Sequence, residues 1–299
     1  MKAPPVSVVI PSHRGGRYLR EAVRSVHQQT LEAIEVIVVA DGCDEDMADL
    51  QTAGVSVIRQ RQRGVSIARN VGVAHARSDL IAFLDDDDRM LPNRLKSQYE
   101  AMHNPAIALC HTQFQVIDAE GELIRQGGSR DSHYSDFLRI DGAVVLSSVM
   151  TRKSVFQEVG GFNPLMSMGE DLDFVFKVAR ESLLCFLPEV LIEYRLHGNN
   201  AWANGSSKGA DIKLILAQHR AAAEARSEME HLSDIREGYR HILPTRSYFA
   251  QLRAREALTE HRYGPFALAA AQALVLAPRA TVRVAARKVQ RERKASSRE

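Results

Sequence analysis

The chain begins with short apolar runs that alternate with helical patterns. Four runs rich in Val, Ile, Leu and Phe do not alternate strictly between apolar and polar positions, which is typical of strands covered on both faces. They are Val6 to Ile10, Ile34 to Ala40, Val55 to Arg59 and Leu80 to Asp85. Apolar residues at three- and four-residue steps predict a helix from Tyr18 to Val26, and Ser66 to Ala76 reads as a second helix. This order predicts an α/β fold with a mostly parallel sheet and flanking helices.

The pattern changes after the acidic run that ends at Asp88. Further helices are predicted over Asn93 to Met102 and Glu170 to Glu181, and further strands over Ile107 to Ile117, Val144 to Thr151 and Leu191 to Leu196. From about Asp211 the sequence is rich in Ala, Arg, Glu and Leu. We therefore expect a sheet domain over residues 1–210 and a helical C-terminal region over residues 211–299.

Composition limits the classes of protein that fit this pattern. The 299 residues are 45% hydrophobic and 25% charged, which suffices for a substantial folded core. The net charge of +2 argues against nucleic acid as a partner. The cysteines Cys43, Cys110 and Cys185 are widely spaced with no C-x-x-C pair, so neither a disulfide scaffold nor a zinc site is predicted.

The two ends of the chain bear on localisation. The N-terminus shows no signal-peptide pattern, and the longest nearly apolar stretch, Phe266 to Ala277, is shorter than the roughly 18 to 20 residues that cross a bilayer. We therefore expect a cytoplasmic protein. Residues 279–299 carry eight Lys or Arg against two Glu, a composition suited to peripheral contact with the anionic inner face of a membrane. The alternative is a solvated C-terminal helix whose apolar residues pack on the sheet domain.

The acidic run is the most informative chemical feature. Asp85, Asp86, Asp87 and Asp88 end a predicted strand, and ligands of open α/β sheets bind at the carboxyl ends of strands. Adjacent carboxylates repel one another, and a hard divalent cation with oxygen ligands relieves that repulsion. A solvated acidic turn is the alternative. An EF-hand loop is excluded, because Met90 and Lys96 occupy the positions that require Gly and Glu.

Six segments together resemble the family 2 glycosyltransferases, whose GT-A fold has a Rossmann-like sheet. In chain order they are VSVVIPSHR, EVIVVADGCDED, GVSIARNVGVAHA, IAFLDDDDRMLPNRL, VGGFNPLMSMGEDLDF and YRLHGNN. They fall within roughly residues 4 to 200. The resemblance implies a nucleotide-sugar site with these residues: Pro11, Ser12, His13, Arg14, Asp41, Arg69, Asp85, Asp86 and Glu170. Asp41 corresponds to the residue that accepts a hydrogen bond from uracil.

The resemblance also implies the remaining roles. Asp87 corresponds to the carboxylate that binds Mn²⁺ or Mg²⁺ on the diphosphate, and His197 to a histidine that contacts the metal or diphosphate in some members. Asp171 corresponds to the catalytic base of an inverting transfer. Without the resemblance, two of these residues have ordinary explanations. Asp171 opens a helix, where the helix dipole favours carboxylates, and His197 could be a loop histidine with no ligand role.

The expected activity is transfer of a sugar from a nucleotide donor to a hydroxyl of a glycan or lipid-linked saccharide. The departures from the family pattern, His13, Arg14, Ala40 and Cys43, surround the base pocket, so a UDP-sugar is favoured without excluding dTDP or GDP. Two alternatives stay open: a catalytically silent relative that binds nucleotide-sugar, and a sugar nucleotidyltransferase.

Overall fold

The computed structural model describes residues 3–142, 144–166, 168–197 and 208–241. The chain divides into two compact units, residues 1–137 with 141–197 and residues 138–140 with 198–299. The first unit contains the sheet. The second contains helix α9, Lys208–Ala225, and a further helix over residues 229–241. The expected domain boundary near residue 210 remains a prediction.

The first four strands form the parallel part of the sheet. They are β1 (Ser7–Ser12), β2 (Glu35–Asp41), β3 (Ser56–Gln60) and β4 (Leu80–Phe83), in the order β3-β2-β1-β4. The predicted α/β fold is therefore confirmed. Strand β4 ends at Phe83 rather than at Asp85, so the acidic run lies in the turn that follows the strand.

The second half of the sheet is mixed, with the order continuing from β4 as β8-β6-β9-β5 and with β7 paired to β6. These strands are β5 (Arg89–Met90), β6 (Ile107–Ile117), β7 (Leu123–Gln126), β8 (Met150–Arg152) and β9 (Leu183–Arg195). Strand β8 is antiparallel to both β4 and β6, and β9 is parallel to β6. Strands β6 and β9 therefore run in the same direction as β4, and the carboxyl end of β9 lies at the same edge as those of β1, β2 and β4.

Two predicted strands differ from the structure. The run from Val144 to Thr151 contains a 3₁₀ turn, η1 (Leu146–Ser148), before the short β8. The strand predicted over Leu191 to Leu196 is the end of the 13-residue β9. The first half of β9 begins with the apolar run Leu183 to Leu187, but Pro188 and Glu189 interrupt the run before Val190. Pairing with β6 continues across this interruption with a shift in register, so one long strand forms.

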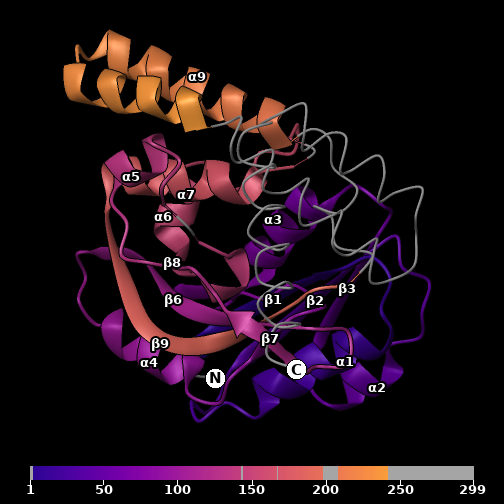
Figure 1. The fold of residues 1–299 in the computed structure, drawn as a ribbon. Helices are drawn as coiled ribbons and strands as arrows, with labels where there is room; N and C mark the ends of the chain where they lie inside the picture. Colours follow the sequence, from indigo (N-terminus) through magenta and orange to yellow (C-terminus); the bar gives the residue numbers. More distant parts are fainter. Residues whose placement is uncertain (1–2, 143, 167, 198–207, 242–299) are drawn as a thin grey trace, which may run out of the picture. The chain divides into compact units, whose positions relative to one another are not determined.

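Helices cover both faces of the sheet (Figure 1). The helices of this unit are α1 (Gly16–His27), α2 (Ala48–Thr52), α3 (Val65–His75), α4 (Arg94–Ala101), α5 (Tyr134–Leu138), α6 (Lys153–Glu158) and α7 (Glu170–Glu181). Alternate strand residues such as Val8 and Ile10 pack in one core with α1, α2 and α4. On the other face, Phe83 of β4 contacts aromatic rings of α6 and α7. The bounds of α7 match the predicted helix.

Helix α3 approaches the sheet closely because it carries a glycine at the contact. A Cβ on Gly72 would lie 2.3 Å from Cγ1 of Val9 in β1. Arg69 lies one turn earlier on the same helix face. The close approach therefore carries the Arg69 side chain in over the sheet, where it is only 4% exposed.

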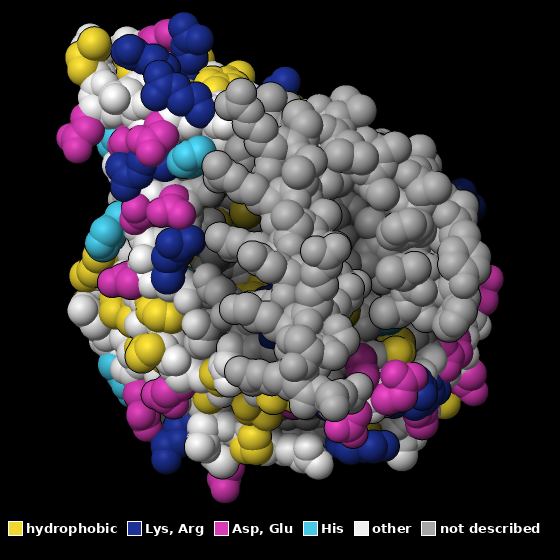
Figure 2. Space-filling view, viewed as in Figure 1, with side chains coloured by type: hydrophobic (Ala, Val, Ile, Leu, Met, Phe, Trp, Pro, Cys, Tyr) yellow, Lys and Arg dark blue, Asp and Glu magenta, His cyan; other side chains and the backbone are white. Residues whose placement is uncertain are grey.

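No helix among the described residues is long and apolar enough to cross a membrane. The apolar stretch from Phe266 to Ala277 and the basic residues 279–299 lie outside the described residues, so peripheral membrane contact remains a prediction. On the face drawn in Figure 2, basic and acidic side chains are interspersed over the described surface.

The carboxylate of Glu35 ties the start of β2 to β1 and to the loop before β4. Ser7 Oγ and the Arg77 guanidinium both donate hydrogen bonds to Glu35, whose side chain is 8% exposed. Burial by itself raises the pKa of Glu35. Hydrogen bonds from the Arg77 backbone and side chain and from Ser7 outweigh burial, so the pKa lies below its ordinary value of 4.5.

We expect Glu35→Gln to lower the free energy of unfolding by about 1 kcal/mol at neutral pH, because charge-assisted hydrogen bonds become neutral ones. The carboxylate's contribution is present above its ordinary pKa and is lost as the pH falls through the depressed folded value. The deficit, measured by urea unfolding, should therefore vanish in acid. Glu32→Gln, at an exposed position, is the control. A deficit that persisted in acid would show that the charge of Glu35 does not contribute.

Candidate active site

The carboxyl edge of the sheet brings distant segments together. Ser12 and Asp41 are the last residues of β1 and β2, and the acidic turn follows β4. His197 lies two residues beyond the end of β9. Parallel strands place these ends side by side, which is where open α/β sheets bind ligands.

Arg69 joins the two acidic segments that the sequence singled out. One terminal nitrogen of its guanidinium lies 2.7 Å from Asp85 Oδ1, and the other lies 2.7 Å from Glu170 Oε1. Burial by itself lowers the pKa of Arg69, but the charges of Asp85 and Glu170 outweigh it, so the net pKa is raised. The fixed fork of the guanidinium suits this double role, and a lysine ammonium lacks that geometry.

The second acidic residue of the turn faces β1. Ser12 Oγ donates a hydrogen bond of 2.5 Å to Asp86 Oδ2 and accepts one from the backbone N–H of Gly15. Burial raises the pKa of Asp86 to about 7, with further contributions from the charges of Asp87 and Asp85, while the Ser12 hydrogen bond opposes the shift. The turn thus concentrates negative charge in a partly dehydrated place.

The third acidic residue faces the end of β9. The distance between Asp87 Oδ2 and His197 Nε2 is 3.0 Å, although the two residues are 110 positions apart in the chain. Both side chains are mostly buried, at 22% and 12% exposed. The sequence-predicted pair of metal-binding residues is therefore brought into contact.

The donor set of the turn fits Mn²⁺ or Mg²⁺ shared with a bound diphosphate. Among the described residues, no three His, Cys, Asp or Glu side chains group as a metal site. Carboxylate oxygens, which Asp85, Asp86 and Asp87 offer, are the donors that these ions prefer. Mg²⁺ in particular is commonly held by one or two carboxylates together with substrate phosphates.

The predicted base pocket is built around Asp41. Its carboxylate accepts hydrogen bonds from Gln60 Nε2 and from the backbone N–H groups of Arg63 and Gly64. These bonds tie the loop before α3 to the end of β2 and leave the carboxylate one unused acceptor position of about four.

The loop after β1 adjoins this pocket. His13 Nδ1 lies 2.8 Å from the backbone oxygen of Asp41, which assigns the proton to that nitrogen because a carbonyl oxygen only accepts. Pro11 and Ser12 are buried, whereas His13 and Arg14 are exposed. Of the four loop residues predicted from the sequence, two are therefore buried in the fold and two face solvent.

Asp171 lies in the first turn of α7. The helix begins at Glu170 after Gly169, whose φ of 78° is in the left-handed region that glycine adopts readily. Asp171 is half-buried, and its Oδ1 accepts a hydrogen bond from the backbone N–H of Leu172. Its neighbour Glu170 is buried, and burial followed by the charge of Asp171 raises the pKa of Glu170, with Arg69 opposing the shift.

Four residues of the site were not predicted as functional. Ser147 Oγ accepts a hydrogen bond from the backbone N–H of Asp85, and Asp88 accepts one from the backbone N–H of Arg195. Tyr18 stacks on His197. Tyr18 was read as part of an apolar helix face, and nothing in the local pattern marks it. Arg195 had a signal, since a strand that ends in YRLHGNN places a cation two residues before His197.

The fold and its acidic edge define an α/β protein with a polar site at the carboxyl ends of its strands. The model of glycosyl transferase family 2 matches residues 7–159, just over half of the chain. The chain therefore belongs to glycosyl transferase family 2. The matched segment includes β1, β2, β4 and the acidic turn, and α7 and His197 lie beyond it.

Curated relatives agree with this assignment. An uncharacterized glycosyltransferase of Rickettsia bellii is 30% identical over 202 residues, covering 65% of this chain and 29% of that protein. One of Rickettsia felis is 25% identical over 243 residues, covering 76% and 40%. One of Nostoc is 27% identical over 244 residues, covering 75% and 70%. The chain thus spans less than half the length of the two Rickettsia relatives.

Solved structures share the fold. S. aureus TarS residues 1–349, in complex with UDP-GlcNAc, matches with a TM-score of 0.63 at 12% identity and covers 91% of this chain and 88% of that one. Another TarS structure matches with a TM-score of 0.55 at 16% identity, covering 71% and 42%. At these identities the likeness concerns the fold alone. It confirms the GT-A architecture expected from the sequence.

We expect Arg69→Met to lower the free energy of unfolding by about 3–5 kcal/mol, because it leaves Glu170 buried without its partner. Adding Glu170→Gln should restore part of that loss by removing the orphaned charge. Urea unfolding of both variants measures the difference. Arg14→Met, at an exposed arginine, is the control and should change the stability by no more than about 0.5 kcal/mol. Equal stability of Arg69→Met and Arg14→Met would contradict the bridging role.

Proposed function

We propose that the chain is an inverting glycosyltransferase that moves a sugar from a nucleoside diphosphate donor to a hydroxyl group of a glycan or lipid-linked saccharide. Arg69 is the observation that carries this proposal. Its guanidinium spans Asp85 of the acidic turn and Glu170 beside Asp171. In such a reaction the diphosphate and the acceptor hydroxyl lie on either side of one sugar, so the residues that bind them have to lie close together. The single side chain of Arg69 bridges the two segments that would supply those residues.

The nucleotide would bind along the carboxyl ends of β1 and β2. Asp41 is held rigidly with one acceptor position left, which suits the single N–H of a uracil ring. His13 is fixed to the Asp41 backbone, and the exposed Arg14 would add a cation near the diphosphate. Asp85 and Asp86 would face the ribose and the transferred sugar. The fold-level likeness to TarS, which was solved with UDP-GlcNAc, supports a UDP-sugar donor by analogy.

Asp171 would act as the general base. An acceptor hydroxyl becomes a good nucleophile only as its proton leaves, so a carboxylate within hydrogen-bond reach is required. Asp171 stands in the first turn of α7, where its half-buried side chain follows directly after Glu170. The pairing of Glu170 with Arg69 removes the adjacent carboxylate from this role and holds the helix start in place.

Asp87 and His197 would hold a divalent cation. When bound, that cation supplies Lewis-acid stabilisation of the negative charge that develops on the departing diphosphate. The protein's own part is to keep the Asp87 carboxylate and the His197 imidazole together at the mouth of the site, which their 3.0 Å contact does. Arg69 of α3 adds a fixed positive charge in contact with Asp85 of the same turn.

We expect Asp171→Asn to lower kcat by about 10²–10⁴-fold, the range in which a positioned general base contributes, while leaving the affinity for UDP with Mn²⁺ within about twofold. Steady-state kinetics with the donor and acceptor pair that turns over, together with calorimetric titration of UDP, would measure both quantities.

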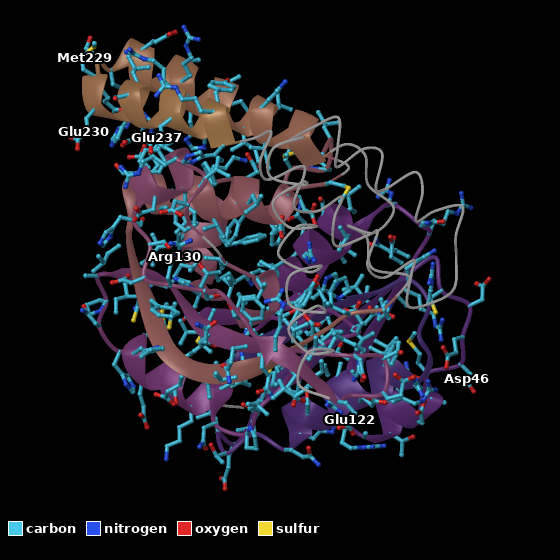
Figure 3. All side chains as sticks on the ribbon, viewed as in Figure 1. Asp46, Glu122, Arg130, Met229, Glu230 and Glu237 are labelled. Carbon is cyan, nitrogen blue, oxygen red and sulfur yellow. The ribbon has the colours of Figure 1, made fainter. Side chains whose placement is uncertain are left out.

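The matched control is Asp46→Asn, at an exposed aspartate labelled in Figure 3, which should change neither quantity. Retention of full turnover by Asp171→Asn would exclude Asp171 as the base. Turnover that releases diphosphate from a nucleoside triphosphate and a sugar phosphate would instead identify a nucleotidyltransferase.

We expect nucleoside diphosphates and their sugars to raise the melting temperature only when Mn²⁺ or Mg²⁺ is present, with UDP compounds giving the largest shift. A ligand at a hundred times its Kd stabilises the native state by about 2.7 kcal/mol, which is readily measured by thermal shift. Asp87→Asn should abolish the metal-dependent part. An equal shift in the presence of excess EDTA would contradict the proposed metal dependence.

A further inference from the structure

Arg195 is almost completely buried, at 1% exposed, where four segments of the first unit meet. Its Nε donates a hydrogen bond of 2.8 Å to the backbone oxygen of Asp87, and its own backbone N–H donates one to Asp88 Oδ1. The terminal nitrogens reach Glu21 of α1, at 2.6 Å, and the backbone oxygen of Ala119 in the β6–β7 turn, at 3.1 Å. The Arg195 guanidinium thus binds the backbone of the acidic turn.

Tyr18 completes this arrangement from α1. The Arg195 guanidinium lies over the Tyr18 ring at 4.5 Å from the centroid. The His197 ring stacks on the same residue, with centroids 5.2 Å apart and planes inclined by 12°. The Tyr18 hydroxyl donates a hydrogen bond to the Ala119 backbone oxygen.

We propose that Tyr18 and Arg195 are positioning residues for the proposed transfer: Arg195 fixes the main chain of Asp87, and Tyr18 fixes the ring of His197 against the Asp87 carboxylate. The inference rests on the proposed function, because it assigns these residues to the site formed by Asp87 and His197. Each acts through a neighbouring residue, Asp87 or His197, that would hold the cation.

Asp87 and His197 both need neighbouring residues to fix their orientation. His197 follows the last residue of β9 by two positions, so sheet hydrogen bonds do not orient its ring. Asp87 lies in a turn, where the carboxylate direction depends on the backbone. Partners that orient metal-binding side chains commonly contribute ten- to hundredfold in metal affinity. Here a ring and a guanidinium from α1 and β9 supply that support.

The test compares Tyr18→Leu with Tyr18→Phe, since the half-buried ring can be altered without emptying the core. We expect Tyr18→Leu to weaken Mn²⁺ affinity in the presence of UDP by about tenfold and Tyr18→Phe to stay within about twofold of wild type. Without metal, UDP binding should be equally weak in wild type and in both variants. Tyr99→Leu is the matched control, because Tyr99 is also a half-buried helix tyrosine beside a histidine, His103, at a ring distance of 4.9 Å.

An NMR measurement of His197 tests the inference without metal or nucleotide. In wild type and Tyr18→Phe, the His197 ring protons should show the upfield shift of a stacked ring and one hydrogen-bonded Nε2 signal, and Tyr18→Leu should lose both. Arg195→Lys, which keeps the charge and loses the fork, should also broaden the His197 signals.

The outcomes separate this inference from the proposed function. Metal-dependent UDP binding that is equally tight in wild type and Tyr18→Leu, with unchanged His197 signals, would overturn the inference and leave the function standing. Wild-type protein that binds UDP equally with and without Mn²⁺ would overturn the metal dependence, and the His197 signals would then decide whether Tyr18 positions that ring. A weakening of Mn²⁺ affinity by Tyr99→Leu as large as by Tyr18→Leu would reduce the effect to general destabilisation and overturn the inference.

Discussion

The buried guanidinium of Arg69 is the constraint on which the site depends. Removing a guanidinium from water is costly, and the cost is offset only when carboxylates meet it with good geometry. Asp85 and Glu170 do so from two segments far apart in the sequence, each at 2.7 Å. The native fold therefore has to bring the end of β4 and the start of α7 together over the sheet, and those are the segments from which a donor and an acceptor would be approached.

A second buried arginine holds the same acidic turn differently. Arg69 binds it through the Asp85 side chain, whereas Arg195 binds it through the Asp87 backbone oxygen. With the main chain held, the Asp86 and Asp87 side chains meet Ser12 and His197 at the sheet edge. Four consecutive aspartates are thus held in distinct environments, which is how one run of identical residues can supply different chemistry.

Family membership and site geometry answer different questions about this chain. The family model covers the strands and the acidic turn, while Glu170, Asp171, Arg195 and His197 lie outside the matched segment. Their connection to the matched part comes from contacts: Arg69 with Glu170, and Asp87 with His197. The helical second unit, by contrast, carries no described feature that bears on donor or acceptor.

The sequence by itself determined the elements whose signals are local. Short, mostly apolar runs marked β1 to β4, the apolar spacing marked α1, and the acidic run marked the carboxyl end of β4. Only the tertiary structure decided which distant residues meet. The partners Asp87 and His197 are 110 positions apart, and Cys110 and Cys185, which showed no pairing pattern, are register partners on β6 and β9. Such pairings depend on strand order and direction, and hydrophobic periodicity records which face of an element is buried but not which element covers it.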